Sequence, residues 1–315
     1  MNIRIILVGL LMGAAEVVPG VSGGTIAFVS GFYERLVNAI QRLTPMSLLE
    51  LRKLGLVRWW REMDINFLLL LFGAMAVSVL VLARGVSFLL ENYPVAIWAF
   101  FFGLVLSSVF VVARRLNPFT VELALAMGTG IALGLTVSHV QPFDAEVSPL
   151  TLFFGGCIAV CAWILPGLSG SFILLILGLY QTVIGAIKNL EILTLSYIAL
   201  GCAVGLVSFS RLIAILLARF HNITVSVLVG FMLGSLVKIW PWKHTTSYQI
   251  TADGGQIPLV QEPVLPTAYQ YLTGNEPGIL YAGLACLVGI LVILILDKFA
   301  LLAESDAEKV TLNRS

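Results

Sequence analysis

The stretch AEVVPGVSGGTIAFVSGFYERLVNAI at residues 15–40 returns later in the chain as AWILPGLSGSFILLILGLYQTVIGAI at residues 162–187. Each copy carries a PG-x-SG sequence in the middle of an apolar run. In one register, Pro19, Gly20, Ser22, Gly23, Gly31, Tyr33, Ala39 and Ile40 recur as Pro166, Gly167, Ser169, Gly170, Gly178, Tyr180, Ala186 and Ile187. Internal repetition of this kind indicates two copies of one structural unit.

A second, fainter repeat follows each of these segments. The sequence FGAMAVSVLVLARGV from Phe72 resembles LGCAVGLVSFSRLIA from Leu200, at an offset that slips by one residue. The alignment makes three pairs equivalent, namely Gly73 with Gly201, Arg84 with Arg211 and Gly103 with Gly230. We therefore predict two related halves, residues 1–140 and residues 145–315.

The composition is that of a membrane protein. Hydrophobic residues make up 59% of the 315 residues and charged residues only 11%, whereas soluble domains carry about 25% charged residues. Apolar runs near the roughly 20 residues that span a bilayer recur along the chain. Helices satisfy their own backbone in lipid, and the runs lack the alternation of a membrane barrel. We predict an all-α polytopic membrane protein. A net charge of +1 gives no basic surface for nucleic acid.

Residues 3–40 are predicted to form a re-entrant helical hairpin. A single helix of this length would measure about 57 Å, nearly twice the hydrocarbon core of a bilayer. Pro19 and Gly20, followed by Ser22 and Gly23, interrupt it near the middle, where proline breaks the hydrogen-bond ladder. Residues 150–187 are predicted to form the same hairpin around Pro166.

Each half is predicted to continue with three membrane spans. They lie at about residues 67–83, 95–113 and 121–138 in the first half, and at about 195–218, 224–240 and 279–301 in the second. A hairpin returns the chain to its starting side, so each half makes an odd number of crossings. The two halves are therefore predicted to be inverted, as in many secondary transporters.

The charges of the loops agree with this topology. Loop 41–64 carries Arg42, Arg52, Lys53, Arg58 and Arg61 and is predicted to be cytoplasmic. Counting crossings from this loop places both termini, Arg114, Arg115 and Arg219 on the cytoplasmic side. It places the more acidic loops 139–149 and 241–278 outside, with the two hairpins entering from opposite faces.

The two hairpin tips are the predicted functional site. Backbone N–H groups at the start of the helix after each break attract an anion, and glycine lets a ligand approach the backbone closely. The alternative is a tight turn packed through small residues. Arginine suits a phosphate because its guanidinium is a planar fork of donors. The candidate phosphate-binding residues are Ser22, Gly23, Gly24, Thr25, Ser169, Gly170, Ser171, Arg84 and Arg211.

A second group of residues is predicted to act in coupling or gating. A carboxylate in an apolar arm is costly without a partner or a cavity, so Glu16 is a candidate proton or cation site. The alternative for Glu16 is that its carboxylate caps the helix after the break. The alternative for Arg84 is that its side chain snorkels to the lipid headgroups. Near the mouths of the hairpins, the further candidates are Tyr33, Glu34, Tyr180 and Gln181.

The segments GAAEVVPGVSGGTIAFVSGFYE, WILPGLSGSFILLILGLYQ and GSLVKIWPW resemble the polyprenyl-phosphate transporter family over nearly the whole chain. The resemblance implies return of undecaprenyl phosphate from the outer to the inner leaflet of the bacterial cytoplasmic membrane, for reuse in peptidoglycan and other envelope polymers. It assigns residues 19–25 and 166–171 to the family's motif positions. The family more often has Asp where this chain has Glu16, so the carboxylate is kept.

Two other functions are compatible with this pattern. A polyprenyl pyrophosphate phosphatase has a related motif, but with an Arg where this chain has Gly23 and Gly170, and with paired glutamates that Glu16 lacks. A cation-coupled carrier of a small soluble anion is the other alternative. No Walker loop, zinc motif or nucleophile–base arrangement occurs in the sequence. We therefore predict a transporter without a cofactor or metal, with coupling to Na⁺ or H⁺ open.

Overall fold

The structure is a computed structural model that describes residues 2–17, 22–44, 47, 51, 53, 55–116, 118–140, 142, 145–250 and 256–312. It is predominantly helical, which confirms the predicted all-α membrane fold. The first half contains α1 (Asn2–Glu16), α2 (Gly23–Val29), α3 (Tyr33–Arg42), α5 (Leu56–Glu62), α6 (Ile65–Asn92), α7 (Pro94–Ala113) and α8 (Val121–His139). The second contains α9 (Pro149–Ile164), α10 (Gly170–Ile176), α11 (Tyr180–Lys188), α12 (Ile192–Arg219), α13 (His221–Ser235), α14 (Pro266–Thr273) and α15 (Ile279–Leu312).

Five helices are long and apolar enough to cross a membrane. They are Ile65–Leu82, Pro94–Ala113, Val121–His139, Ile192–Arg219 and Ile279–Lys298. These five cover five of the six predicted spans. The protein is therefore a multi-pass membrane protein.

The predicted span at residues 224–240 is wrong in extent, because α13 ends at Ser235. The chain continues in tight turns, in which the N–H groups of Lys238 and Ile239 donate to carbonyls three residues back. Pro241 follows shortly, and a residue before proline is disfavoured in a helix. The result is a 15-residue helix in place of a full span.

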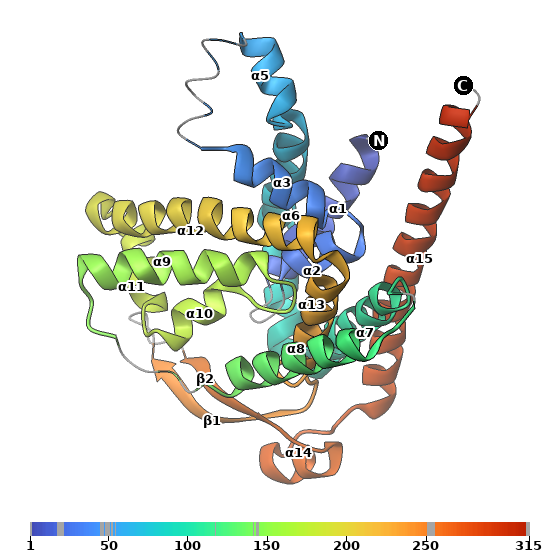
Figure 1. Ribbon diagram of the computed structural model, residues 1–315. Coiled ribbons are helices and arrows are strands. Elements are labelled where there is room, and N and C mark those ends of the chain that lie inside the picture. The colour runs from blue at the N-terminus through green and yellow to red at the C-terminus, as the bar shows by residue number, and fades with distance from the viewer. Residues whose placement is uncertain are drawn as a thin grey trace.

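The predicted loop 241–278 has secondary structure that we did not foresee. Strands β1 (Lys243–Ile250) and β2 (Gln256–Pro263) pair antiparallel, with Lys243 opposite Pro263 and Ile250 opposite Gln256. The ladder is irregular between Thr245 and Tyr248. Figure 1 shows this hairpin and α14 at the end of the molecule opposite to both chain termini and α5.

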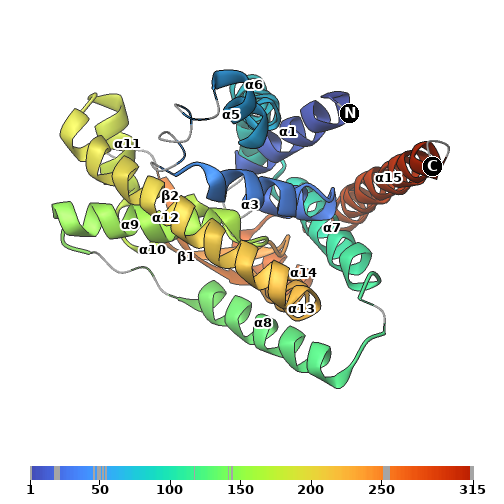
Figure 2. The same ribbon diagram turned by 45° about the horizontal axis from the view of Figure 1, so that its top comes forward.

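The helices of the two halves follow the same order and pack in corresponding pairs. Within the first half α1 packs on α6, and within the second α9 packs on α12. Between the halves, α7 packs on α15 and α8 packs on α13. Both views show α12 along α9, and α15 at the edge of the molecule beside α7 (Figures 1 and 2). The division into two inverted repeats stays a prediction.

Glycines bring the paired helices close together at equivalent places. A Cβ added at Gly103 would lie 2.2 Å from the Cys286 carbonyl oxygen of α15, and one at Gly230 would lie 2.0 Å from the Met127 carbonyl oxygen of α8. No Cβ contact is that short, so only glycine permits these approaches. Gly73, in contrast, has open space around it.

Asp297 ties the last helix to the end of α7. Its carboxylate is buried and forms ion pairs with Arg114 and Arg115, the latter at 2.8 Å. Both guanidiniums are roughly 40% exposed, so one end of the cluster reaches the surface. An isolated carboxylate in a span is costly, and these two cations stabilise it.

We expect Gly230→Ala to destabilise the protein, because the added methyl group would push α13 away from the backbone of α8. Overpacking of this kind costs about 1–3 kcal/mol. The matched control is Gly73→Ala, where the methyl group meets nothing, and stability should stay level or rise by up to about 1 kcal/mol from helix propensity. Thermal unfolding of the purified proteins in one detergent measures both. Equal stability of the two variants would contradict the close approach of α8 and α13.

Candidate functional site

The tips of the two hairpins meet inside the protein. The Ser22 hydroxyl donates to the Trp163 carbonyl oxygen at 3.2 Å. In the other direction, the Gly167 N–H donates to Thr25 Oγ1 at 2.9 Å. Ser22 and Thr25 are fully buried. Two segments more than 140 residues apart in the chain are thus joined by direct polar contacts.

The first tip is held by hydrogen bonds to its own backbone amides. Ser22 is the N-cap of α2, and its hydroxyl oxygen accepts from the Gly24 N–H at 3.1 Å. The Glu16 carboxylate accepts from the Gly23 N–H at 2.7 Å. Because Gly23 is the first residue of α2, this contact is the one expected from the alternative prediction, in which Glu16 caps the helix after the break. Pro19, Gly20 and Val21 of the predicted motif lie outside the described residues.

Glycine at position 24 lets the second hairpin approach. A Cβ there would lie 2.9 Å from the Ile164 carbonyl oxygen and 3.0 Å from that of Trp163. Trp163 is the residue that the repeat aligns with Glu16, and its side chain lies near the Glu16 carboxylate. The equivalent positions of the two halves therefore meet each other, one as a carboxylate and the other as an indole.

The second tip has a different internal arrangement. Ser169 and Ser171 are hydrogen-bonded to each other, with their hydroxyl oxygens 2.7 Å apart, and Ser169 makes no side-chain cap to α10. Gly167 has a positive φ of 94°, which favours glycine. A Cβ at Gly167 would lie 2.6 Å from Ser235 Oγ, so this tip also packs against the end of α13.

The second arm of each hairpin is bent, a feature that we did not predict from the sequence. Gly31 and Gly178 adopt positive φ angles of 76° and 69° between the two short helices of the arm. Helices α10 and α11 meet at 111°. The signal was present in the sequence, because Gly31 and Gly178 are among the residues that repeat.

The predicted gating residues begin the outer helices of the hairpins. Tyr33 and Tyr180 are the first residues of α3 and α11. Within the described part of the chain, the buried Tyr33 hydroxyl and Gln181 Nε2 have no hydrogen-bond partner. Glu34 is exposed and its carboxylate lies 2.8 Å from His221 Nε2. This contact joins α3 to the start of α13, and we assigned no role to His221 from the sequence.

The two arginines predicted to bind phosphate are exposed on α6 and α12. Neither guanidinium has an ion pair or hydrogen bond within the ranges that the structure describes. Gly205 packs against Cys157 of α9, and Arg211 lies six residues further along α12, a rise of about 9 Å. This register brings Arg211 toward the level of the tips along the helix axis. Among the described residues, however, the Arg211 side chain makes no hydrogen bond or ion pair with either tip.

Several of the described N–H groups at the tips donate to protein oxygens in this conformation. Gly23, Gly24 and Gly167 donate as given above, and the Thr25 N–H donates to the Ser22 carbonyl oxygen at 3.0 Å. An anion at the first tip would therefore have to replace the Glu16 carboxylate. Within the described residues, no group of three or more His, Cys, Asp or Glu side chains is placed to hold a metal ion.

We expect Thr25→Val to weaken the contact between the hairpins. Valine keeps the shape of threonine but leaves the buried Gly167 N–H without an acceptor, which costs about 1–3 kcal/mol. The control is Thr129→Val on α8, because the Thr129 hydroxyl is exposed and bonds only within its own helix. Thermal unfolding in detergent should separate the two variants, and identical melting temperatures would contradict the contact.

We expect Glu34→Gln to lower the pKa of His221. Burial alone would lower it, but hydrogen bonds to Glu34 and Asn222 and the charge of Glu34 together raise it above its ordinary value of about 6.5. The charged pair is thus fully present below about pH 6.5 and is lost as the pH rises through the raised pKa. NMR titration with ¹⁵N-labelled histidine in nanodiscs measures this, with Glu91→Gln as the control. An unchanged His221 titration in Glu34→Gln would contradict the pair.

Comparison with known proteins places this architecture in a family. Residues 12–257 match the family VCA0040-like, described as undecaprenyl phosphate translocase-like. The polyprenyl-phosphate transporter of Vibrio cholerae serotype O1 is 42% identical over 296 residues, covering 93% of this chain and 96% of the relative. The polyprenyl-phosphate transporter of Staphylococcus aureus is 29% identical over 256 residues, covering 75% and 85%. No solved structure matches. The chain belongs to the VCA0040-like, undecaprenyl phosphate translocase-like family.

Proposed function

We propose that this protein transports a polyprenyl phosphate, returning undecaprenyl phosphate from the outer to the inner leaflet of the cytoplasmic membrane. The carrier lipid is then available again for peptidoglycan and other envelope polymers. Two relatives that align along most of this chain are named polyprenyl-phosphate transporters. The observation that carries the proposal is the direct bonding of the two hairpin tips, Ser22 to Trp163 and Gly167 to Thr25.

Contacts between the tips suit a site that opens to one leaflet at a time. Each tip belongs to its own half, and in our proposal the halves are inverted, so that separating the tips in either direction exposes polar groups to one side. Only two hydrogen bonds join the tips directly among the described residues. Each contributes a net free energy of about 0.5–1.5 kcal/mol, so a phosphate headgroup that replaced them would offset their loss.

In this proposal the Glu16 carboxylate competes with the lipid phosphate for the same hydrogen-bond donor. This carboxylate accepts from the Gly23 N–H, as the oxygen of a bound phosphate would. Two anions at one set of donors repel each other. The phosphate is therefore proposed to bind when Glu16 is neutralised by H⁺ or Na⁺, or displaced. This competition would couple the lipid to an ion.

The proposed orientation follows from the charged loops. Loop 41–64, Arg114, Arg115, Arg219 and both termini face the cytoplasm, and the β1–β2 hairpin faces outward. Hairpin α9–α11 then opens toward the outer leaflet, where the lipid phosphate is collected. Hairpin α1–α3 opens toward the inner leaflet, where it is released.

We expect Glu16→Gln and Arg211→Ala to slow the return of lipid phosphate at least tenfold while both proteins insert normally. Glu16→Gln keeps the shape but abolishes the ion-dependent competition, and Arg211→Ala removes the candidate phosphate-binding cation of α12. The matched controls are Glu91→Gln at the exposed end of α6 and Arg219→Ala, two turns beyond Arg211 on α12. The measurement is the fraction of undecaprenyl phosphate accessible from outside proteoliposomes over time.

Three outcomes would count against the proposal. The first is normal return of the lipid in both variants at equal expression. The second is release of inorganic phosphate from undecaprenyl pyrophosphate by the purified protein, which would identify a phosphatase. The third is uptake of a water-soluble anion with no change in the sidedness of the lipid, which would identify a small-anion carrier.

A further inference from the structure

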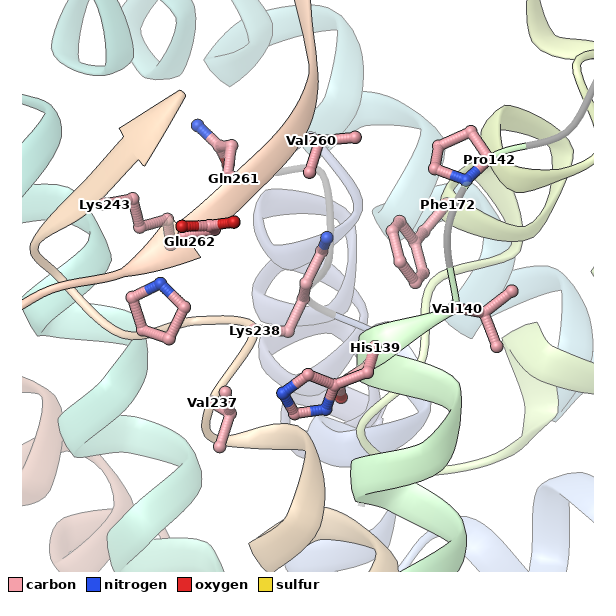
Figure 3. A pocket seen from close by; sticks show the side chains of 12 residues that line it. His139, Val140, Pro142, Phe172, Val237, Lys238, Lys243, Val260, Gln261 and Glu262 are labelled. Atoms are coloured by element: carbon pink, nitrogen blue, oxygen red, sulfur yellow. The ribbon is translucent and has the colours of Figure 1, made fainter. Parts of the chain in front are cut away.

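A cavity of about 340 Å³ lies at the end of the molecule that carries the β1–β2 hairpin, within the about 300–1,000 Å³ typical of ligand pockets. The end of α8, helix α10, the turns after α13 and strands β1 and β2 enclose it. Figure 3 shows Lys238 extending into the middle, with Phe172 on one side, Gln261 and Glu262 on the other, and His139 below it. Lys243 of β1 completes the lining.

The side-chain nitrogens of both lysines lie over aromatic rings. The Lys238 ammonium lies 4.2 Å from the centre of the Phe172 ring, and the Lys243 ammonium lies 3.1 Å from that of Trp98. Among the described residues, no carboxylate lies within the roughly 4 Å of an ion pair from either ammonium. Glu262 lines the same cavity without pairing with them. Cation–π contacts alone compensate poorly for removing an ammonium from water.

The lysine side chains that line the cavity are therefore not paired with a carboxylate among the described residues, and this favours binding of an anion. Two lysines and His139 face one carboxylate, that of Glu262. Burial, together with the charge of Lys238, lowers the pKa of Lys243 well below its ordinary range. A dianion between the two ammoniums would offset both effects, because it supplies the missing opposite charge and separates two like charges.

We propose that this cavity binds a phosphate group that carries two negative charges, either the monoester headgroup of a lipid or inorganic phosphate. Lysine is a common phosphate ligand through its point charge. Two ammoniums favour a dianion over the single charge of a phosphodiester, so the cavity would discriminate against ordinary phospholipid headgroups. Where the phosphate is the singly protonated form, Glu262 can accept its proton in a hydrogen bond.

The position of the cavity connects it to the hairpin tip. Phe172, on which Lys238 lies, is in α10, directly after Ser171 of the motif. Lys238 follows Ser235 by three residues, and Ser235 packs against Gly167 at the tip. A phosphate that drew Lys238 away from Phe172 would therefore act on α10, which begins at the tip, and on the turns after α13, next to Ser235. In this part the inference rests on the proposed function, in which this face of the protein receives lipid phosphate from the outer leaflet.

The test measures phosphate binding to the full-length protein in nanodiscs, by tryptophan fluorescence. Trp98 lies against Lys243, so moving the ammonium should change its emission, and Trp98→Phe should remove the response. We expect saturable responses to inorganic phosphate and methyl phosphate, and at least tenfold weaker binding of dimethyl phosphate. Lys238→Gln and Lys243→Gln should each weaken phosphate binding at least tenfold. Lys53→Gln is the control, because Lys53 is exposed and lies before α5, far along the chain from the cavity.

The outcomes separate the possibilities. Unchanged affinity in both lysine variants, or equal binding of methyl and dimethyl phosphate, would overturn the proposal. Lys243→Arg keeps the charge and should restore most of the affinity, which distinguishes a lost ligand contact from misfolding. Tighter binding of a short-chain polyprenyl phosphate than of inorganic phosphate would identify a lipid headgroup as the ligand, and the reverse order would identify free phosphate. Phosphate binding without lipid transport would leave this site standing and reject the proposed function.

Discussion

The structure depends on how two interrupted helices satisfy their backbone polar groups away from water. A broken helix in a membrane is stable only where other protein groups accept its hydrogen bonds. Here each tip supplies part of what the other lacks. Thr25 accepts from the Gly167 N–H, and Ser22 donates to the Trp163 carbonyl. Because these contacts cross between the halves, neither hairpin has a complete set of partners without the other half of the chain.

The remaining helices form a framework around this contact. The pairs α1·α6 and α9·α12 lie within the halves, and the pairs α7·α15 and α8·α13 join them. At the joining pairs, Gly103 and Gly230 allow the backbones to approach closely. Small-residue packing of this kind suits a lipid environment, where apolar side chains gain little by leaving the solvent. Each hairpin is thus attached to its own half through its first helix, α1 or α9, while α3 of the first hairpin packs on α12 of the other half.

Related positions in the two halves have diverged in chemistry. Glu16 and Trp163 are equivalent in the repeat, yet one is a carboxylate and the other an indole, and they contact each other. Thr25 is equivalent to Phe172; the first bonds to the opposite tip, while the second lies under the Lys238 ammonium. The repeated sequence therefore carries unlike side chains at matching positions, with a carboxylate near one tip and, beside Phe172, two lysines near the mouth of the other hairpin.

The sequence alone was sufficient to predict a helical membrane protein with helix breaks just before Gly23 and around Pro166, because hydropathy and the effects of proline and glycine are local properties of the chain. It also identified Gly103 and Gly230 as equivalent. Only the tertiary structure decided which polar groups meet across the tips, since those contacts join residues 141 and 142 positions apart. The same holds for the Asp297 cluster and for the cavity of Lys238 and Lys243. Ion pairs and cavities depend on helix rotation and register, which local patterns do not specify.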